Sequence, residues 1–189
     1  MKFYALSVVY FDDILIYSRS LEEHLDHLSV VFYALRNAHL FGNLEKCTFC
    51  TDQVSFLGYV VTPQGIEVDQ AKVEAIHSWP VPTMVTQLRS FLGLAGFYCR
   101  FVKDFSTIAS PLHELTKKSA TFTWAAPHQS AFDMLKDKLT HAPLLQLLDF
   151  SKTFELQCDA SGIGLGGLLL QEGKPVAYFS EKLSGPSLN

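Results

Sequence analysis

The sequence predicts an α+β fold in which antiparallel hairpins and helices follow one another along the chain. Runs rich in Val, Ile, Phe and Tyr flank turn residues near position 12 and again near position 64. Apolar residues recur at helical spacing over much of residues 21–140, and strand-like segments with many glycines follow residue 153. With 189 residues, 48% of them hydrophobic, the chain is long enough for one or two small domains with their own cores.

The first stretch combines a hairpin and a helix. Residues 3–10 and 14–17 are predicted strands, which places two aspartates at or beside their connection. Ser20, followed by Glu23, is typical of a helix N-terminus, and the apolar spacing predicts a helix from about Leu21 to Ala38. His24 and His27 lie three residues apart on this helix, where a solvated polar face is a better interpretation than a metal site.

The middle stretch predicts a second hairpin and two helices. The sequence QVSFLGYVVTPQGIEVD has Pro and Gly at a turn between apolar strands, and Asp69 is expected to cap a short helix that ends near His77. Pro80 and Pro82 end that helix and indicate a hinge or a subdomain boundary. Thr83 is expected to cap the next helix, in which Gly93 and Gly96 are spaced for close packing against a neighbour.

The remaining segments predict two helices and three strands. A helix over about residues 105–117 contains Pro111, so we expect it to be broken or to begin late. The sequence ATFTW predicts a short strand, and Pro127 marks the start of another helix. Three antiparallel strands then follow, with Asp159 at the end of the first and a turn at residues 172–174. Without a covering helix this sheet would leave one apolar face in water.

Composition limits the class of protein. The apolar runs are too short to span a bilayer and no signal peptide opens the chain, so we expect an intracellular protein without a membrane partner. The four cysteines (Cys47, Cys50, Cys99 and Cys158) lack a disulfide or zinc framework and are expected to be reduced. The net charge is −4, but residues 71–118 carry six Lys and Arg against three Asp and Glu, so this segment is the basic part.

Asp12 and Asp13 have two interpretations. Two adjacent carboxylates in a hairpin are a common turn filler, and composition alone favours that view. Phosphoryl transfer with metal ions, however, requires hard oxygen ligands on a rigid backbone, and a hairpin with bulky apolar flanks supplies one.

A family resemblance changes this balance. YFDDILIYS resembles the Y-x-D-D box of reverse transcriptases, and the chain is similar, over nearly its whole length, to the polymerase of gypsy-class LTR retrotransposon Pol polyproteins. The segments that carry the likeness occur in the family's order: SLEEHLDHL, LEKCTF, FLGYVVTPQGIEVDQAKVEAI, WPVPTMVTQLRSFLGLAGFYCRFVKDFS, ASPLHEL and FELQCDASGIGLGGLLLQ. Six motifs in order make the likeness specific.

The resemblance implies four regions. Residues 1–79 would be the C-terminal half of a polymerase palm, made of antiparallel hairpins and a helix, and residues 80–118 a helical thumb. Residues 119–150 would be a connection, and residues 151–189 a truncated RNase H-like domain with its first strands.

The resemblance also implies metal and nucleic-acid sites. Asp12 and Asp13 would bind catalytic Mg²⁺, with Mn²⁺ as the alternative, and Asp159 would be the first acidic residue of a two-metal nuclease site. The contacts implied for nucleic acid are the primer-steadying residues Phe56, Leu57, Gly58 and Tyr59, and the phosphate-binding residues Arg89, Arg100 and Lys103. A strand glycine at a bulge and ordinary surface solvation are the simpler alternatives for these two groups.

The implied partners are an RNA template and a DNA primer, as an RNA–DNA hybrid, with deoxynucleotides only in the complete enzyme. Missing polyprotein segments or an oligomer are further possible partners, and a cytoplasmic particle or the nucleus is the expected location. Both active sites of the family need further carboxylates that this chain lacks, so we expect neither DNA synthesis nor RNA cleavage by the isolated chain. The alternatives are a noncatalytic nucleic-acid-binding remnant and an unselected remnant without activity.

Overall fold

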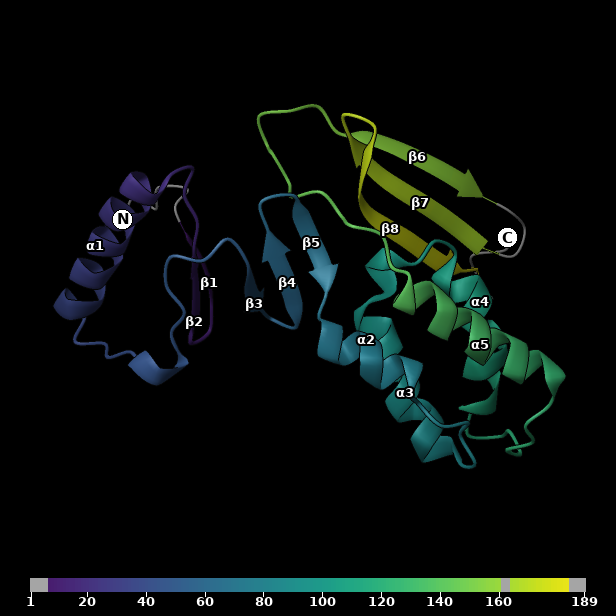
Figure 1. Cartoon of the computed structure of the whole chain (residues 1–189). Coiled ribbons are helices and arrows are strands. Elements are labelled where there is room, and N and C mark those ends of the chain that lie inside the picture. Colours follow the sequence, from purple (N-terminus) through teal and green to yellow (C-terminus); the bar gives the residue numbers. More distant parts are fainter. Residues whose placement is uncertain (1–6, 161–163, 184–189) are drawn as a thin grey trace. The chain divides into compact units, whose positions relative to one another are not determined.

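A computed structural model describes residues 7–160 and 164–183 and divides the chain into two compact units, Met1–Leu57 and Gly58–Asn189 (Figure 1). Its helices and antiparallel strands confirm the predicted α+β class. The elements of the first unit are β1 (Ser7–Tyr10), β2 (Asp13–Ile16), α1 (Leu21–Asn37), the 3₁₀ helix η1 (Leu44–Lys46) and β3 (Val54–Phe56). The predicted first hairpin is confirmed, although residues 3–6 of its first strand lie outside the described residues.

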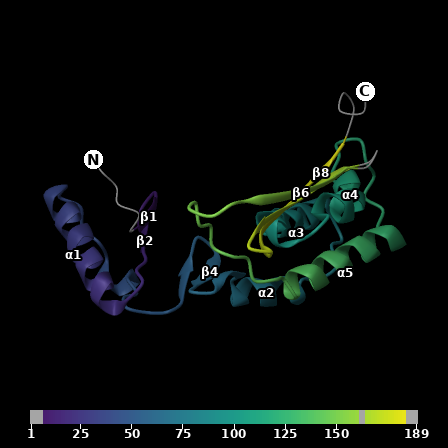
Figure 2. The ribbon, with the colours of Figure 1, turned by 90° about the horizontal axis from the view of Figure 1, so that it is seen from above.

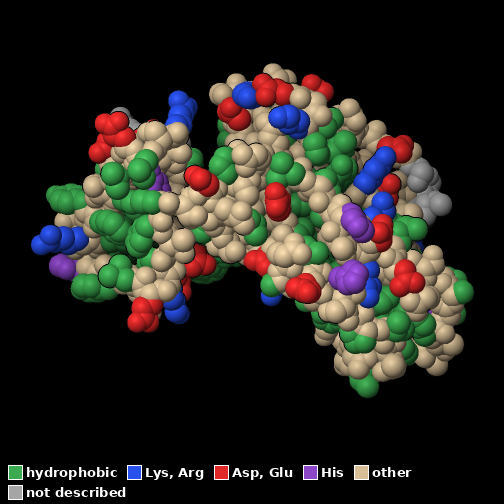
Figure 3. Space-filling view, in the orientation of Figure 1, with side chains coloured by type: hydrophobic (Ala, Val, Ile, Leu, Met, Phe, Trp, Pro, Cys, Tyr) green, Lys and Arg blue, Asp and Glu red, His purple; other side chains and the backbone are tan. Residues whose placement is uncertain are grey.

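Helix α1 begins where the sequence predicts. The Ser20 hydroxyl accepts a hydrogen bond from the backbone N–H of Glu23 at 3.2 Å, and the Glu23 carboxylate accepts one from the N–H of Arg19 at 2.7 Å. Its apolar stripe, however, is mostly open: Leu28 is 8% exposed, but Leu25 is 53% and Phe32 48% exposed. Figure 3 shows hydrophobic side chains gathered on this face of the first unit. Capping, more than burial, therefore fixes the start of this helix.

The second unit contains a hairpin, four helices and a three-stranded sheet. Its elements are β4 (Tyr59–Thr62), β5 (Gly65–Val68), α2 (Gln70–His77), α3 (Val85–Phe97), the 3₁₀ helix η2 (Cys99–Phe101), α4 (Phe105–Leu115), α5 (Ala126–Thr140), β6 (Glu155–Ala160), β7 (Gly164–Gln171) and β8 (Lys174–Lys182). The helices share one hydrophobic core, in which the rings of Phe91 and Phe132 lie 4.6 Å apart. This core includes residues of β5, of all four helices and of η2, and Tyr178 on β8 packs against it.

The sheet of the second unit is antiparallel in the order β6-β7-β8, as predicted. Strand β8 lies against helix α4, as Figures 1 and 2 show from two directions. The backbone N–H of Ser106 donates to the hydroxyl of Ser180 at 3.1 Å, and the ammonium of Lys182 donates to the hydroxyl of Ser110 at 2.7 Å. These contacts fasten the sheet to the helices through its β8 edge. Leu156, on the opposite edge strand, is 67% exposed, in agreement with the expected open apolar face.

The chain between α5 and β6 joins the hairpin to the sheet. Leu145 exchanges two backbone hydrogen bonds with Ile66 on β5, at 2.7 and 3.0 Å, and the N–H of Gln146 donates to the carbonyl of Pro175 on β8 at 2.8 Å. Further along, the fully buried Gln171 accepts a hydrogen bond from the N–H of Asp149 at 3.0 Å and donates one to its carbonyl at 2.7 Å. The segment is thus held by three different strands.

Two predicted helix features are wrong. Helix α3 begins after Met84 without a side-chain cap, because Thr83 instead donates both its N–H and its hydroxyl to the Gln87 side chain, at 2.8 and 3.0 Å. Helix α4 runs unbroken through Pro111. Its buried side chains pack on both sides of the proline, which offsets the hydrogen bond that proline cannot donate.

The predicted strand at residues 120–124 is also wrong, since this segment has no regular structure. No strand among the described residues pairs with this segment. Phe122 and Trp124 instead pack against the hydrophobic core, and the Trp124 indole donates to the Gln129 side chain at 2.8 Å.

The predicted hinge lies within the second unit. There Trp79 packs on Phe91, and the Trp79 carbonyl accepts a hydrogen bond from Lys136 at 2.9 Å. The four proposed regional boundaries stay predictions.

Candidate functional site

The two adjacent aspartates lie at the tip of the first hairpin. Phe11 and Asp12 form a two-residue turn, and Asp13 opens β2 opposite Tyr10. Phe11 has a φ of +50°, which a bulky residue adopts only at a cost of about 1–3 kcal/mol. Both carboxylates are exposed. The tight turn therefore presents two carboxylates on neighbouring backbone positions.

Asp12 and Asp13 provide some, but not all, of the ligands that a hard divalent cation needs. Two carboxylates can bind Mg²⁺ that keeps several of its water ligands. Among the residues described here, no group of three or more His, Cys, Asp and Glu side chains is arranged to hold a metal ion. Asp12 and Asp13 thus supply two oxygen donors but not a full set of protein ligands.

The other polar candidates of the first unit have local roles. The rings of His24 and His27 lie 3.1 and 2.8 Å from the hydroxyl of Ser18, and both residues are half-buried. The predicted solvated face is therefore wrong for these two histidines. All four cysteines are free, as expected.

Gly58 and Tyr59, the two predicted primer-steadying residues that belong to the second unit, pack on the end of helix α3. Gly58 has a φ of +79°, and a side chain there would begin 3.2 Å from the Phe97 ring. The hydroxyl of Tyr98, which is 1% exposed, donates to the Gly58 carbonyl at 2.7 Å. Burial raises the pKa of Tyr98 to about 12, and the carboxylate of Asp69 adds to this effect. Gly58 is therefore required by the fold itself.

Tyr59 belongs to the same aromatic cluster. The Tyr59 ring stacks on the Phe97 ring with centroids 5.1 Å apart. The guanidinium of Arg100, on η2, lies over the Tyr59 ring, 5.6 Å from its centroid. Burial raises the pKa of Tyr59, partly opposed by the charge of Arg100. Phe56 and Leu57, at the end of the first unit, are half-buried. The role of these four residues in binding a primer stays a prediction.

The three predicted phosphate-binding residues differ in their surroundings, although all are exposed. Arg89 donates to the Thr116 carbonyl at the end of α4 at 2.8 Å, so part of its guanidinium already has a partner. Arg100 lies beside the Tyr59 ring. Lys103, which follows η2, makes no hydrogen bond or ion pair with any described residue. Lys103 is consequently the most available of the three for a phosphate.

Helix α3 carries an open face that the sequence analysis missed. Apart from the neighbouring residues and the nearby backbone of α3 itself, no described atom lies within 4 Å of the position where a side chain on Gly93 or Gly96 would begin. Ser90 and Phe97, both exposed, lie on the same face at helical spacing. The two glycines therefore do not pack against a neighbour within the described chain, as we expected them to. The signal was present as two glycines, three residues apart, within one helix.

Asp159 is exposed on β6, directly opposite Gly166 on β7. The carboxylate of Asp104 lies 3.5 Å from the point where a side chain on Gly166 would begin. Because directly opposite residues share a face of an antiparallel pair, Asp104 lies over the face that carries Asp159. The sequence analysis did not single out Asp104. This residue is the N-cap of α4 and has a φ of +60°.

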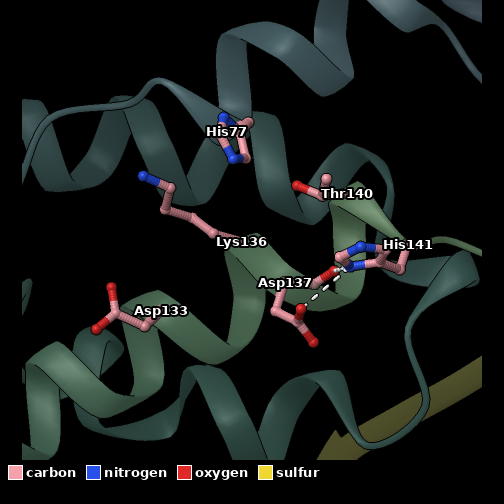
Figure 4. Close-up of a pocket in the computed structure, with 6 residues that line it drawn as sticks. All are labelled: His77, Asp133, Lys136, Asp137, Thr140 and His141. Carbon is pink, nitrogen blue, oxygen red and sulfur yellow. Dashed lines mark hydrogen bonds and ion pairs between the residues drawn. The ribbon is translucent and has the colours of Figure 1, made fainter.

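A hollow lies between the end of α2 and the C-terminal half of α5. Figure 4 shows His77 facing the α5 side chains Asp133, Lys136, Asp137, Thr140 and His141. The Asp137 carboxylate lies 3.1 Å from the His141 ring, and the buried hydroxyl of Thr140 has no partner among the described residues. Since Lys136 already donates to the Trp79 carbonyl, the remaining ionisable side chains of this hollow are two aspartates and two histidines.

Two family descriptions match separate parts of the chain. Residues 4–61 match "Reverse transcriptase (RNA-dependent DNA polymerase)", and residues 124–189 match "RNase H-like domain found in reverse transcriptase". The described residues contain no helix that is long and apolar enough to cross a membrane.

Relatives of much greater length match nearly the whole chain. The Retrovirus-related Pol polyprotein from transposon 297 of Drosophila melanogaster is 42% identical over 183 residues, which cover 96% of this chain and 17% of the relative. The corresponding polyprotein from transposon gypsy of the same species is 35% identical over 96% of the chain and 19% of its own length. The Tf2-3 polyprotein of Schizosaccharomyces pombe is 36% identical over 96% of the chain and 14% of its length.

The fold is similar to solved reverse transcriptase structures. The foamy viral protease-reverse transcriptase in complex with an RNA/DNA hybrid superposes with a TM-score of 0.87 at 29% identity, over 96% of this chain and 25% of the other. The dRH form of that protein in complex with double-stranded DNA gives a TM-score of 0.85 at 29% identity, over 94% of this chain and 32% of the other.

Proposed function

Because the chain belongs with the reverse transcriptase and RNase H-like region of retrotransposon Pol polyproteins, we propose that it contributes to RNA-directed DNA synthesis and RNA cleavage on an RNA–DNA hybrid. The chain spans less than a fifth of the length of the curated relatives described above. The proposal therefore concerns the part that these residues play within a larger activity. An intracellular location, in a cytoplasmic particle or the nucleus, is part of the same proposal.

The observation that carries the proposal is the acidic hairpin tip. Asp12 and Asp13 are exposed on a two-residue turn whose first residue, Phe11, has an unfavourable positive φ. Strained backbone persists where the surrounding structure requires it, and such positions are frequent at functional sites. In this proposal Asp12 and Asp13 hold Mg²⁺, or Mn²⁺ in its place. The bound ion would stabilise negative charge on the reacting phosphate oxygens.

The second unit would hold the duplex. The α3 face that contains Gly93 and Gly96 has no side chains beyond the backbone at these two positions, so a nucleic-acid backbone can approach the helix closely. Arg89, four residues before Gly93 on α3, and Arg100, on η2, are exposed, which suits contacts to phosphate without sequence readout. Asp159 would provide one carboxylate of the nuclease site.

Metal binding tests the acidic hairpin. Titration of the 189-residue chain with Mn²⁺, followed by paramagnetic broadening of backbone amide signals, should broaden the signals of residues 10–14 first. The double substitution Asp12→Asn with Asp13→Asn should abolish that broadening. Asp52→Asn, an exposed aspartate elsewhere in the same unit, is the matched control and should leave it unchanged. Broadening that survives the double substitution would contradict the assignment.

A noncatalytic nucleic-acid-binding role is the second candidate. It is favoured by the finding that the described part of the chain has no group of three or more potential metal-binding side chains. A primer-extension assay with Mg²⁺ tests whether this chain is catalytic by itself. We expect the purified chain to bind an RNA–DNA hybrid without incorporating nucleotides. Incorporation would show that the chain is catalytically sufficient by itself.

A further inference from the structure

A serine and two histidines of the first unit form a polar cluster where β2 meets α1. The Ser18 hydroxyl, two residues after β2, lies 3.1 Å from the Nδ1 atom of His24 and 2.8 Å from that of His27, both on α1. All three residues are half-buried, and the side chain of His27 is 13% exposed. These contacts join the exit of the acidic hairpin to the helix that follows it.

The acidic hairpin needs such a support. Strands β1 and β2 form a sheet of two strands, and three of the four β1 residues are exposed. A two-stranded hairpin is only marginally stable in water unless it packs against another element. Strand β2 contacts α1, and Figures 1 and 2 show the two elements side by side. We therefore expect the order of the turn that carries Asp12 and Asp13 to depend on the junction with α1.

Hydrogen bonding at Ser18 restricts the protonation of the two rings. A hydroxyl carries one hydrogen, so Ser18 can donate to only one of the two Nδ1 atoms, and the other Nδ1 must carry a hydrogen itself. While one ring is neutral, Ser18 donates to that ring and accepts from the other. When both rings are charged, both Nδ1 atoms are donors, and two positive rings lie against a single oxygen.

The neighbouring charges compensate one protonated ring but not two. One carboxylate oxygen of Glu23 lies 3.8 Å from Nε2 of His27, and the other oxygen accepts a hydrogen bond from the backbone N–H of Arg19 at 2.7 Å. The other charged residues between β2 and the middle of α1 are exposed: Asp13, Arg19, Glu22 and Asp26. Glu23 thus offsets the charge of one ring, and a second positive ring would have no such partner among the described residues.

We propose that Ser18, His24 and His27 are positioning residues of the acidic hairpin, which hold β2 against α1 while one ring is neutral and release it when both rings are protonated. The inference rests on the proposed function, since it concerns the same Mg²⁺-binding hairpin. The released form holds more protons than the bound form, so a fall in pH favours release. Histidine side chains change charge between about pH 5 and 8, so release belongs to mildly acidic solution.

Amide hydrogen exchange tests the proposal on the 189-residue chain without any metal ion. Protection factors, which remove the intrinsic pH dependence of exchange, are measured for residues 13–16. In the wild type they should fall at least about tenfold between about pH 7.5 and 5.5. Ser18→Ala should give low protection at both pH values. Its matched control, Ser29→Ala, removes an exposed hydroxyl that donates to the Leu25 carbonyl within α1, and should behave as the wild type does.

Asparagine variants separate positioning from a general structural role. The asparagine side chain places a donor and an acceptor at the position of the histidine Nδ1 atom, and it takes up no proton in this pH range. The variant His24→Asn with His27→Asn should therefore keep residues 13–16 protected at both pH values, whereas His24→Leu with His27→Leu should lose protection at both. His39→Asn, at an exposed histidine of the same unit, should retain the pH dependence of the wild type.

The exchange results decide the positioning role by themselves. Protection of residues 13–16 that is independent of pH in the wild type would overturn the proposal, and so would a fall with pH in the double asparagine variant. Equal losses in β2 and along the whole of α1 would show unfolding of the unit and would overturn it as well.

Mn²⁺ binding tests the link to the proposed function separately. The Mn²⁺ concentration that half-broadens the signals of residues 10–14 should rise at least about threefold in Ser18→Ala, because fewer molecules hold the hairpin in its binding form. Absence of this broadening in the wild type would contradict the proposed function, while the exchange results would still decide the positioning role. Broadening of residues 24–27 before residues 10–14 would assign the histidines to metal binding and would overturn the positioning role.

Discussion

The carbonyl oxygen of Leu145 occupies the space in which Gly65 would carry a side chain. The same oxygen accepts a hydrogen bond from the N–H of Ile66 at 2.7 Å. Gly65 has a φ of +155°, so its backbone is also one that other residues rarely adopt. A glycine at the start of β5 thus permits a segment some 80 residues further along the chain to pair with that strand.

We predict that Gly65→Ala destabilises the second unit by at least about 2 kcal/mol, because the methyl group would displace a hydrogen-bonded carbonyl and the φ is unfavourable. Urea unfolding at equilibrium measures this loss. Gly96→Ala is the control, since its side chain would begin in open space. Equal stability of the Gly65→Ala variant and the wild type would show that Leu145 does not hold its position.

Gly93→Ala should have opposite effects on stability and on binding. Alanine within a helix is favoured over glycine by about 1 kcal/mol, so the variant should unfold at higher urea concentration. The added methyl group, and more so the side chain of Gly93→Leu, should weaken hybrid binding if a nucleic-acid backbone approaches α3 at this position. Gly42→Ala, also in open space but in the first unit, should leave affinity unchanged. Unaltered affinity of the Gly93→Leu variant would exclude this helix face from the interface.

Because the pKa of Tyr98 is raised, we predict that the free energy of unfolding falls at alkaline pH. This pKa is about 12 in the folded chain, against 10 for an exposed tyrosine. Between these values the unfolded chain releases the phenol proton and the folded chain retains it, so the free energy of unfolding falls as pH rises above 10. Tyr98→Phe should cost about 1 kcal/mol at pH 8, through the lost hydrogen bond to Gly58, and should reduce the alkaline decline. Urea unfolding at pH 8–11.5 measures this decline. The control is Tyr33→Phe, since Tyr33 is 69% exposed, and this variant should lose stability with pH as the wild type does.

Two glutamines of the second unit should respond differently to the same substitution. Gln171→Met removes an acceptor of the Asp149 N–H and one of the two donors to the Asp149 carbonyl, which also accepts from the Lys152 N–H. The lost hydrogen bonds should cost about 1–3 kcal/mol. Gln146→Met should stay within about 1 kcal/mol of the wild type, because its buried Oε1 has no partner among the described residues. Equilibrium unfolding gives both values, and similar costs for the two variants would contradict the role assigned to Gln171.

Local signals made much of this fold predictable. The turn at Pro63–Gln64 and the caps at Ser20 and Asp69 act within a few residues, so their chemistry can be recognised in the sequence. The strand prediction for residues 120–124 was wrong because aromatic residues favour strands in general, whereas Phe122 and Trp124 pack against the hydrophobic core formed by the helices. Propensity does not reveal whether a partner strand exists.

The candidate site was less predictable for the same reason. The sequence indicates two adjacent carboxylates at a turn, but the positive φ of Phe11 depends on the final hairpin geometry. The proximity of Asp104 to Gly166 arises from packing between segments far apart in the chain. Spacing rules for helices and strands carry no information about such contacts.

Leu145 and Gln146 together fix the spacing between the β4–β5 hairpin and the β6–β7–β8 sheet. Consecutive residues bind the β5 strand and the β8 strand, so the hairpin that begins with Tyr59 and the sheet that carries Asp159 are separated by a fixed span of backbone. Under the proposed function, a duplex bound at that hairpin would reach the strand that carries Asp159 at a constant number of base pairs from the hairpin. Lengthening this short tether by one residue would change that register.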